Sequence, residues 1–199
     1  MTSNSTTKPH HHGNLREALI AAGIDIMKEG GLPALTLRAC AARAGVSHAA
    51  PAHHFDGLPG LLAAIAAQGF GVFAETMIKE RGEMGPAPYH GLLGICRGYL
   101  IFAQKNPAMF TLMFDAEMDI TDDSVLMENA NAAYGVLTTA CAPFEPLDAG
   151  AGGLEMMVWS LVHGFANLQL SGRLGPRNAP VRSMNFEDIL PELTLRNSS

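Results

Sequence analysis

The stretch between residues 36 and 55 limits the possible folds of this chain more than any other. Thr36 is suited to begin a helix, because a threonine hydroxyl accepts a hydrogen bond from a backbone amide of the first turn. The apolar residues that follow have the spacing i, i+3, i+4 and i+7 of one helix face: Leu37, Cys40, Ala41 and Ala44. The stretch therefore begins with a short amphipathic helix.

A tight turn and a second helix are predicted directly after it. Gly45 favours the left-handed conformation that ends helices. Val46 can fill the angle between two helices, and Ser47 can cap a second helix that runs to Phe55. Two helices joined in this way are typical of the helix-turn-helix, whose second helix enters the DNA major groove. A helix hairpin without a DNA-binding role is the alternative interpretation.

The rest of the sequence predicts an all-α fold. Hydrophobic residues make up 48% of the chain and charged residues 16%, which leaves ample apolar surface for a core. Helical periodicity recurs and no strand alternation of any length occurs. The predicted helices cover residues 14–30, 36–44, 47–55, 59–81, 92–105, 108–114, 124–142 and 153–171. The apolar runs 61–73 and 154–170 contain polar side chains and are interpreted as buried helices rather than membrane spans.

These helices suggest a division into a tail and two functional parts. Residues 1–12 are expected to form a mobile tail, residues 13–57 a helix-turn-helix domain, residues 58–172 a helical body and residues 173–199 a C-terminal tail. Residues 1–57 hold five Lys/Arg and four Asp/Glu, whereas residues 58–199 hold eight and fifteen. Because Lys and Arg supply most nonspecific DNA affinity, this weakly basic head predicts modest binding that falls with salt.

The same residues carry a family resemblance. The chain resembles the TetR/AcrR family of one-component transcriptional repressors over about residues 9–172, including the first helix, the helix-turn-helix and the pair His54-Phe55. Three phrases are similar to one branch of that family: Pro9-His10-His11-His12-Gly13-Asn14-Leu15-Arg16, Ser47-His48-Ala49-Ala50-Pro51 and Trp159-Ser160-Leu161-Val162-His163-Gly164. The chain departs from the family at Ala52 and Leu58, where members usually carry a tyrosine and a lysine that touch DNA phosphates.

The resemblance implies a homodimer that binds a DNA operator and releases it when a small apolar effector binds. A cytoplasmic location is expected because Cys40, Cys96 and Cys141 form no Cys-x-x-Cys pair and are interpreted as reduced core residues rather than ligands or disulfides. The family dimerises through its last two helices, here residues 124–142 and 153–171. No cofactor is expected. Candidates for base or phosphate contact are Ser47, His48 and His53, and candidates for positioning on phosphates are Thr36, Arg38, Arg43 and His54.

Aromatic and methionine side chains of the body predict an adaptable apolar pocket for the effector. The candidate residues are Phe73, Met77, Tyr99, Phe102, Met109, Phe110, Met113, Trp159 and His163. An ordinary packed core is the alternative interpretation for each apolar residue. His163 can be either a core histidine bonded to a backbone carbonyl or the polar group that orients a ligand.

Other patterns in the sequence give little support for an enzyme or a metal-binding protein. The sequence has no Gly-x-Ser-x-Gly, no Gly-x-x-x-x-Gly-Lys and no His-Glu-x-x-His, so no enzymatic activity is predicted. The acidic run 115–120 lacks the glycine and the final carboxylate of a calcium loop. Two other functions remain open: a helical ligand-binding dimer whose DNA binding is weakened or lost, and a metal-binding protein that uses His10-His11-His12.

Overall fold

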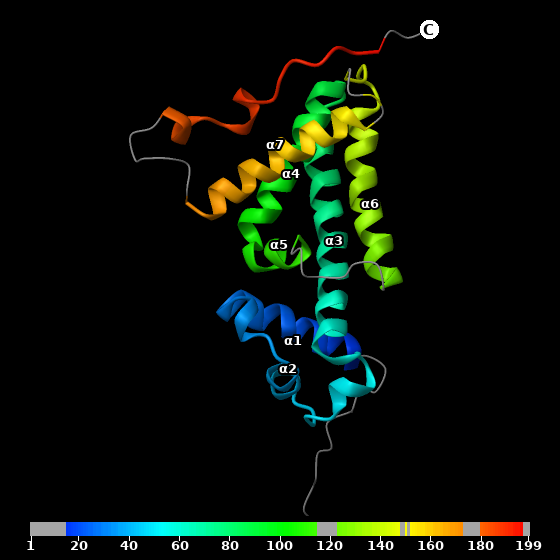
Figure 1. Cartoon of the computed structure of the whole chain (residues 1–199), viewed down its shortest axis with the longest axis vertical. Helices are drawn as coiled ribbons and strands as arrows, with labels where there is room; N and C mark the ends of the chain where they lie inside the picture. The colour runs from blue at the N-terminus through cyan, green and yellow to red at the C-terminus, as the bar shows by residue number, and fades with distance from the viewer. Residues whose placement is uncertain (1–14, 115–122, 148–149, 151, 173–179, 197–199) are drawn as a thin grey trace, which may run out of the picture. The chain divides into compact units, whose positions relative to one another are not determined.

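The computed structural model describes residues 15–114, 123–147, 150, 152–172 and 180–196, and the expected histidine tail and acidic run lie outside them. The described residues are all-α, as predicted, with one isolated antiparallel bridge between Phe144 and Leu195 and no strand. Figure 1 shows the helices α1 (Leu15–Gly30), α2 (Leu37–Arg43), α3 (Gly57–Glu83), α4 (Pro88–Lys105), α5 (Pro107–Met113), α6 (Ser124–Cys141) and α7 (Gly153–Leu170). Short 3-10 helices are η1 (Leu32–Ala34), η2 (Ala50–His53), η3 (Pro180–Ser183) and η4 (Phe186–Asp188).

The chain divides into two compact units, Met1–Ile65 and Ala66–Ser199. The boundary lies inside α3, later than the division after residue 57 that the sequence suggests. In the first unit, α1 and α2 pack together and the start of α3 contributes to the same core. Leu19, Cys40 and Leu61 are fully buried there. The first unit is therefore a small bundle around one apolar centre.

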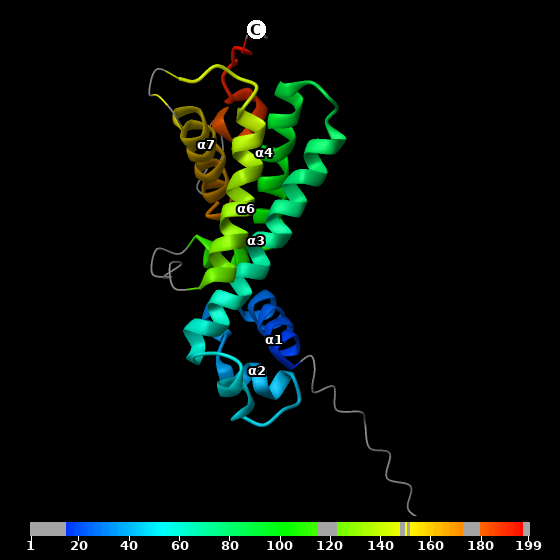
Figure 2. The same ribbon diagram turned by 90° about the vertical axis from the view of Figure 1, so that its right-hand side faces the viewer.

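In the second unit, α4 lies at the centre of the packing. It contacts α5, α6 and α7, and Figure 2 shows α6 and α7 beside it. Its crossing with α3 is close, because a Cβ atom on Gly94 would lie 2.6 Å from the Arg81 Cα and one on Gly98 would lie 2.6 Å from the Met77 Cα. The two glycines thus let the backbones of α3 and α4 touch.

Side chains cap the first turns of α2 and α6. Thr36 caps α2 as predicted, since its hydroxyl accepts a hydrogen bond from the Ala39 amide at 3.1 Å. The cap of α6 is Asp123, one residue before the start of the predicted helix 124–142. Its carboxylate accepts hydrogen bonds from the Val125 and Leu126 amides, both at 2.9 Å, and an anion is favourable at the positive end of a helix.

One face of α7, the second helix of the expected dimer interface, is covered by the C-terminal segment of its own chain. Phe165 is 8% exposed, and its ring meets that of Phe186 in η4 at 5.8 Å in an edge-to-face arrangement. The C-terminal segment of the same chain therefore covers this part of α7. Leu168 and Met156 remain exposed on α7.

One described helix, α3, is long and apolar enough to cross a membrane. However, 61% of its apolar window is buried inside the protein. Burial of this kind is what a core helix shows, in agreement with the interpretation of run 61–73.

Candidate DNA-binding segment and ligand cavity

The turn after α2 has the geometry that the sequence predicts. Gly45 adopts a φ of 70°, the left-handed region in which a side chain would be strained. The Val46 amide donates to the Ala41 carbonyl at 3.0 Å and the Gly45 amide to the Ala42 carbonyl at 3.2 Å. This pair of bonds is the Schellman motif, which satisfies the free carbonyls at a helix end.

The segment after the turn differs from the predicted recognition helix. The predicted α-helix 47–55 is wrong, because the structure forms only the 3-10 helix η2 with Ala49 at its N-cap and no side-chain cap bond. Pro51 explains the difference, since proline has no backbone N–H and disfavours the helical conformation of the residue before it. The backbone instead makes short-range bonds, such as Ala50 amide to Ser47 carbonyl at 3.0 Å.

The side chains proposed from the sequence as DNA contacts are all exposed: Thr36, Arg38, Arg43, Ser47, His48, His53 and His54. Two of them already have partners. The Thr36 hydroxyl caps α2, and Arg43 Nη1 donates to Glu29 Oε1 at 2.7 Å. The Arg43 hydrogen bond lowers the pKa of Glu29, so both groups carry their charge at neutral pH. Arg43 would therefore contact a DNA phosphate while part of its positive charge is already neutralised by Glu29.

Phe55 fixes the end of this segment in the first unit. The side chain is buried, and the Arg16 guanidinium lies 5.4 Å from the centre of its ring, within the range of a cation–π contact. Ala52 is exposed just before it, and Leu58 is half-buried in the first turn of α3. A longer side chain at position 52 would extend into solvent, where it could reach a phosphate.

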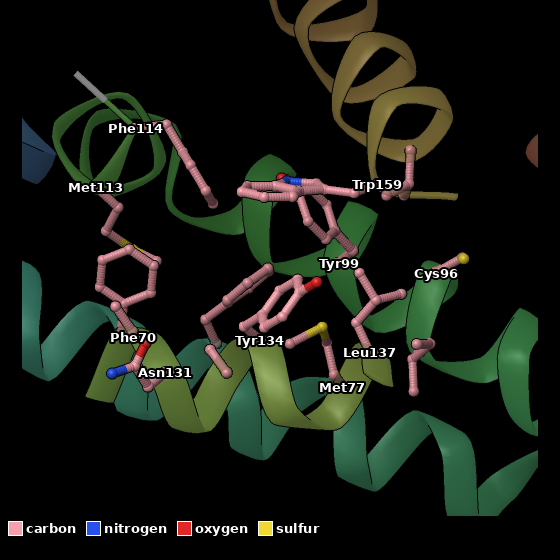
Figure 3. A pocket seen from close by; sticks show the side chains of 15 residues that line it. Phe70, Met77, Cys96, Tyr99, Met113, Phe114, Asn131, Tyr134, Leu137 and Trp159 are labelled. Atoms are coloured by element: carbon pink, nitrogen blue, oxygen red, sulfur yellow. The ribbon is translucent and has the colours of Figure 1, made fainter. Parts of the chain in front are cut away.

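The second unit contains a cavity of about 610 Å³ between its helices. Figure 3 shows aromatic and sulfur-containing side chains around it. The lining residues are Phe70, Phe73 and Met77 of α3; Ile95, Cys96 and Tyr99 of α4; Met113 and Phe114; Ala130, Asn131, Ala133, Tyr134 and Leu137 of α6; and Trp159 and Val162 of α7. This lining is mostly apolar, and none of these residues carries a charge at neutral pH.

The cavity brings together part of the predicted pocket. The predicted residues that line it are Phe73, Met77, Tyr99, Met113 and Trp159. The predicted residues outside the lining are Phe102, Met109, Phe110 and His163. Phe102 and Phe110 are nearly fully buried and support the wall from behind. Met109 lies toward α3, where its sulfur would be 2.8 Å from a Cβ on Gly69.

All the lining residues that α6 contributes were missed by sequence reasoning, and Phe70, Ile95, Cys96, Phe114 and Val162 are likewise absent from the predicted candidates. Tyr134 lines the cavity although it is 45% exposed, and Asn131 is exposed one turn before it. The Tyr134 and Trp159 rings lie 6.0 Å apart, so α6 and α7 form one wall together. A tyrosine and a leucine three residues apart, Tyr134 and Leu137, were the available signal.

His163 lies behind the cavity and is bonded to its wall. Its Nδ1 is 2.7 Å from the Tyr99 hydroxyl, and its ring meets those of Phe110 and Phe114. Burial lowers the pKa of His163, so the ring is neutral at pH 7. Burial also raises the pKa of Tyr99, so its hydroxyl keeps its proton. The partner of His163 is thus a side chain and not the backbone carbonyl considered from the sequence.

The described residues hold no group of three or more His, Cys, Asp or Glu side chains that could bind a metal ion. The three cysteines are free and buried, as expected for core residues. Cys96 lines the cavity, but burial raises the pKa of its thiol, which disfavours the reactive thiolate.

Comparison with known proteins agrees with this architecture. Residues 92–190 match the family model described as tetracyclin repressor-like, C-terminal domain. A structure of a protein of unknown function from Rhodococcus sp. RHA1 is 29% identical, with a TM-score of 0.72, covering 88% of this chain and 91% of that one. No curated protein matches the chain.

Two further structures are named as transcription regulators. A TetR family transcription regulator from Marinobacter aquaeolei VT8 is 14% identical, with a TM-score of 0.59, covering 92% of this chain and 97% of that one. The TetR-like regulator LfrR from Mycobacterium smegmatis, in complex with proflavine, is 18% identical, with a TM-score of 0.58, covering 85% and 92%. The chain therefore has the fold of TetR-type transcription regulators, and residues 92–190 correspond to the C-terminal domain of such proteins.

Proposed function

We propose that the chain is a ligand-responsive member of the TetR family: a cytoplasmic homodimer that represses transcription and leaves its operator when a small, mostly apolar effector binds. The observation that carries this proposal is the cavity of about 610 Å³, lined by side chains from α3 to α7. Its size and apolar lining are those of small-molecule sites. Effector and DNA would be coupled by about 1–3 kcal/mol, as is typical of allosteric proteins.

The first unit supports the DNA-binding half of the proposal. Its capped α2, its Schellman turn and the following segment 47–54, which is mostly exposed apart from the buried Pro51, have the order of a helix-turn-helix. The exposed histidines at 48, 53 and 54 supply hydrogen-bond donors and acceptors for base edges or phosphates. Because η2 is short and few cations surround it, we propose that operator binding is comparatively weak.

Exposed apolar residues on the last two long helices support the homodimer. They are Val125 and Tyr134 on α6, and Met156 and Leu168 on α7. These two helices are the ones through which the family that the sequence resembles dimerises, and exposed apolar side chains on them are available to a partner. A two-fold dimer would read two operator half-sites about one DNA turn apart, roughly 34–36 Å. Membership of the branch marked by Trp159 and His163 belongs to this proposal as well.

Titration of the purified chain with DNA from its own promoter, at a low and a high salt concentration, tests the proposed function. Fluorescence anisotropy should show saturable binding that weakens steeply with salt. A scrambled duplex of equal length is the control and should bind more weakly. Equal binding of both duplexes, or no binding to either, would favour the alternative function, a helical ligand-binding dimer without DNA binding.

A further inference from the structure

The hydrogen bond between Tyr99 and His163 indicates which chemical group the cavity recognises. Among the described lining residues, the Tyr99 hydroxyl is the buried one, since Tyr134 and Asn131 are exposed. His163 of α7 reaches this hydroxyl through Nδ1 at 2.7 Å. Figure 3 shows Tyr99 ending beside the indole of Trp159.

The direction of this bond follows from the acidity of the two groups. A neutral imidazole has one nitrogen that accepts, and the short contact lies at Nδ1 of His163. A phenol hydroxyl is a stronger acid than the N–H of a neutral imidazole, so the stronger bond is the one in which the Tyr99 hydroxyl donates to Nδ1. On this ground we assign His163 the tautomer that carries its proton on Nε2.

This arrangement leaves Tyr99 as an acceptor only. Its proton is bonded to Nδ1 of His163, and its lone pairs remain for a molecule in the cavity. An acceptor such as an ether or a ketone would meet no donor at Tyr99. A charged ligand would be desolvated without a counter-charge among the lining residues, which is unfavourable.

We propose that the cavity selects a neutral aromatic molecule with one O–H or N–H group, which donates a hydrogen bond to the Tyr99 oxygen, and that His163 is the positioning residue that fixes this preference. The aromatic part would lie against the rings of Phe73, Phe114 and Trp159. The inference rests on the proposed function only in taking this cavity as the effector site.

Two probes with the same ring system test the proposal: para-phenylphenol, which donates, and para-methoxybiphenyl, which only accepts. Binding is followed by calorimetry and by the fluorescence of Trp159, the only tryptophan of the chain. The ratio of the two dissociation constants is compared between the wild type and Tyr99→Phe. One neutral hydrogen bond is worth about three- to tenfold in affinity, so the preference for the phenol should fall by about that factor in Tyr99→Phe.

A second variant separates positioning from mere packing. His163→Leu frees the Tyr99 proton, so the preference should shift toward the ether, whereas a purely structural His163 would weaken both probes equally. Phe144→Leu is the matched control, since it changes a buried aromatic residue outside the lining and should leave the ratio unchanged.

An unchanged ratio in Tyr99→Phe, binding of neither probe, or tighter binding of the cationic biphenylmethylamine would each overturn the inference. None of these measurements involves DNA, so the promoter titration decides the proposed function separately. Loss of promoter binding with an intact phenol preference would refute the regulator and leave the site standing.

Discussion

The two units of the chain assemble their candidate residues in different ways. In the first unit the candidate DNA contacts follow one another along the chain and are exposed. In the second unit the cavity takes its residues from five helices, and most of them are buried. The arrangement of the candidate residues therefore depends on local backbone geometry in the first unit, and on the packing of helices distant in sequence in the second. Substitutions can test this difference.

The largest effect is expected at Phe165. Phe165→Glu removes a ring packed on Phe186 and buries a carboxylate, so the free energy of unfolding should fall by at least about 3–5 kcal/mol, the cost of truncating a buried phenylalanine. Chemical denaturation of the purified variant measures this. Leu168→Glu on the same helix is the control, because Leu168 is 46% exposed; it should keep the fold and, if the dimer forms as proposed, yield monomers. Similar stability losses for both variants would contradict the packing of α7.

The close crossing of α3 and α4 should be the next most sensitive place. Gly98→Ala brings a methyl group against the α3 backbone at Met77, so it should cost about 1–3 kcal/mol of stability. Gly71→Ala on α3 meets no atom within 4 Å and should instead stabilise the helix, by up to about 1 kcal/mol. Thermal unfolding of the two variants gives the comparison, and a neutral Gly98→Ala would show that the crossing can widen freely.

The same contrast explains what the sequence could predict. The cap at Thr36, the turn at Gly45 and the long helices follow from local signals, and the structure confirms them. The 3-10 helix at Pro51 is also local in origin, because proline disfavours the helical conformation of the residue before it, whereas the cap signal of Ser47 predicts an α-helix at the same place. In the cavity, the aromatic residues of α3 and α4 were visible as a set. The role of Tyr134 and the position of His163 depend on helix rotation, which periodicity alone does not determine.

A smaller effect is expected in the first unit. There, Ala52→Tyr combined with Leu58→Lys introduces the tyrosine and the lysine that members of the TetR/AcrR family usually carry at these positions. The double variant should bind all DNA more tightly, and the slope of log K against log salt should steepen by about 0.9, the contribution of one phosphate. Anisotropy titrations over a range of salt measure the slope. Ala52→Phe with Leu58→Gln controls for side-chain size, and an unaltered slope in the lysine variant would refute docking in the expected manner.

The smallest effect concerns the pH dependence of stability. Burial lowers the pKa of His163 from its ordinary value of 6.5, so the unfolded chain binds this proton more readily than the folded protein does. The stability that neutral His163 contributes is complete above pH 6.5 and is lost as the pH falls through the lower, folded-state pKa. The stability difference between the wild type and His163→Gln should therefore shrink on acidification. Denaturation of both proteins at several pH values between about 7 and 5 measures it, and a constant difference would exclude protonation of His163 in that range.

The glycine crossing has a mechanical consequence. At Gly94 and Gly98 no side chain separates α4 from the backbone of α3, so there is no rotamer change that could absorb a small shift of α4. A shift of α4 at this crossing would therefore act directly on the backbone of α3 at residues 76–81, within the second unit.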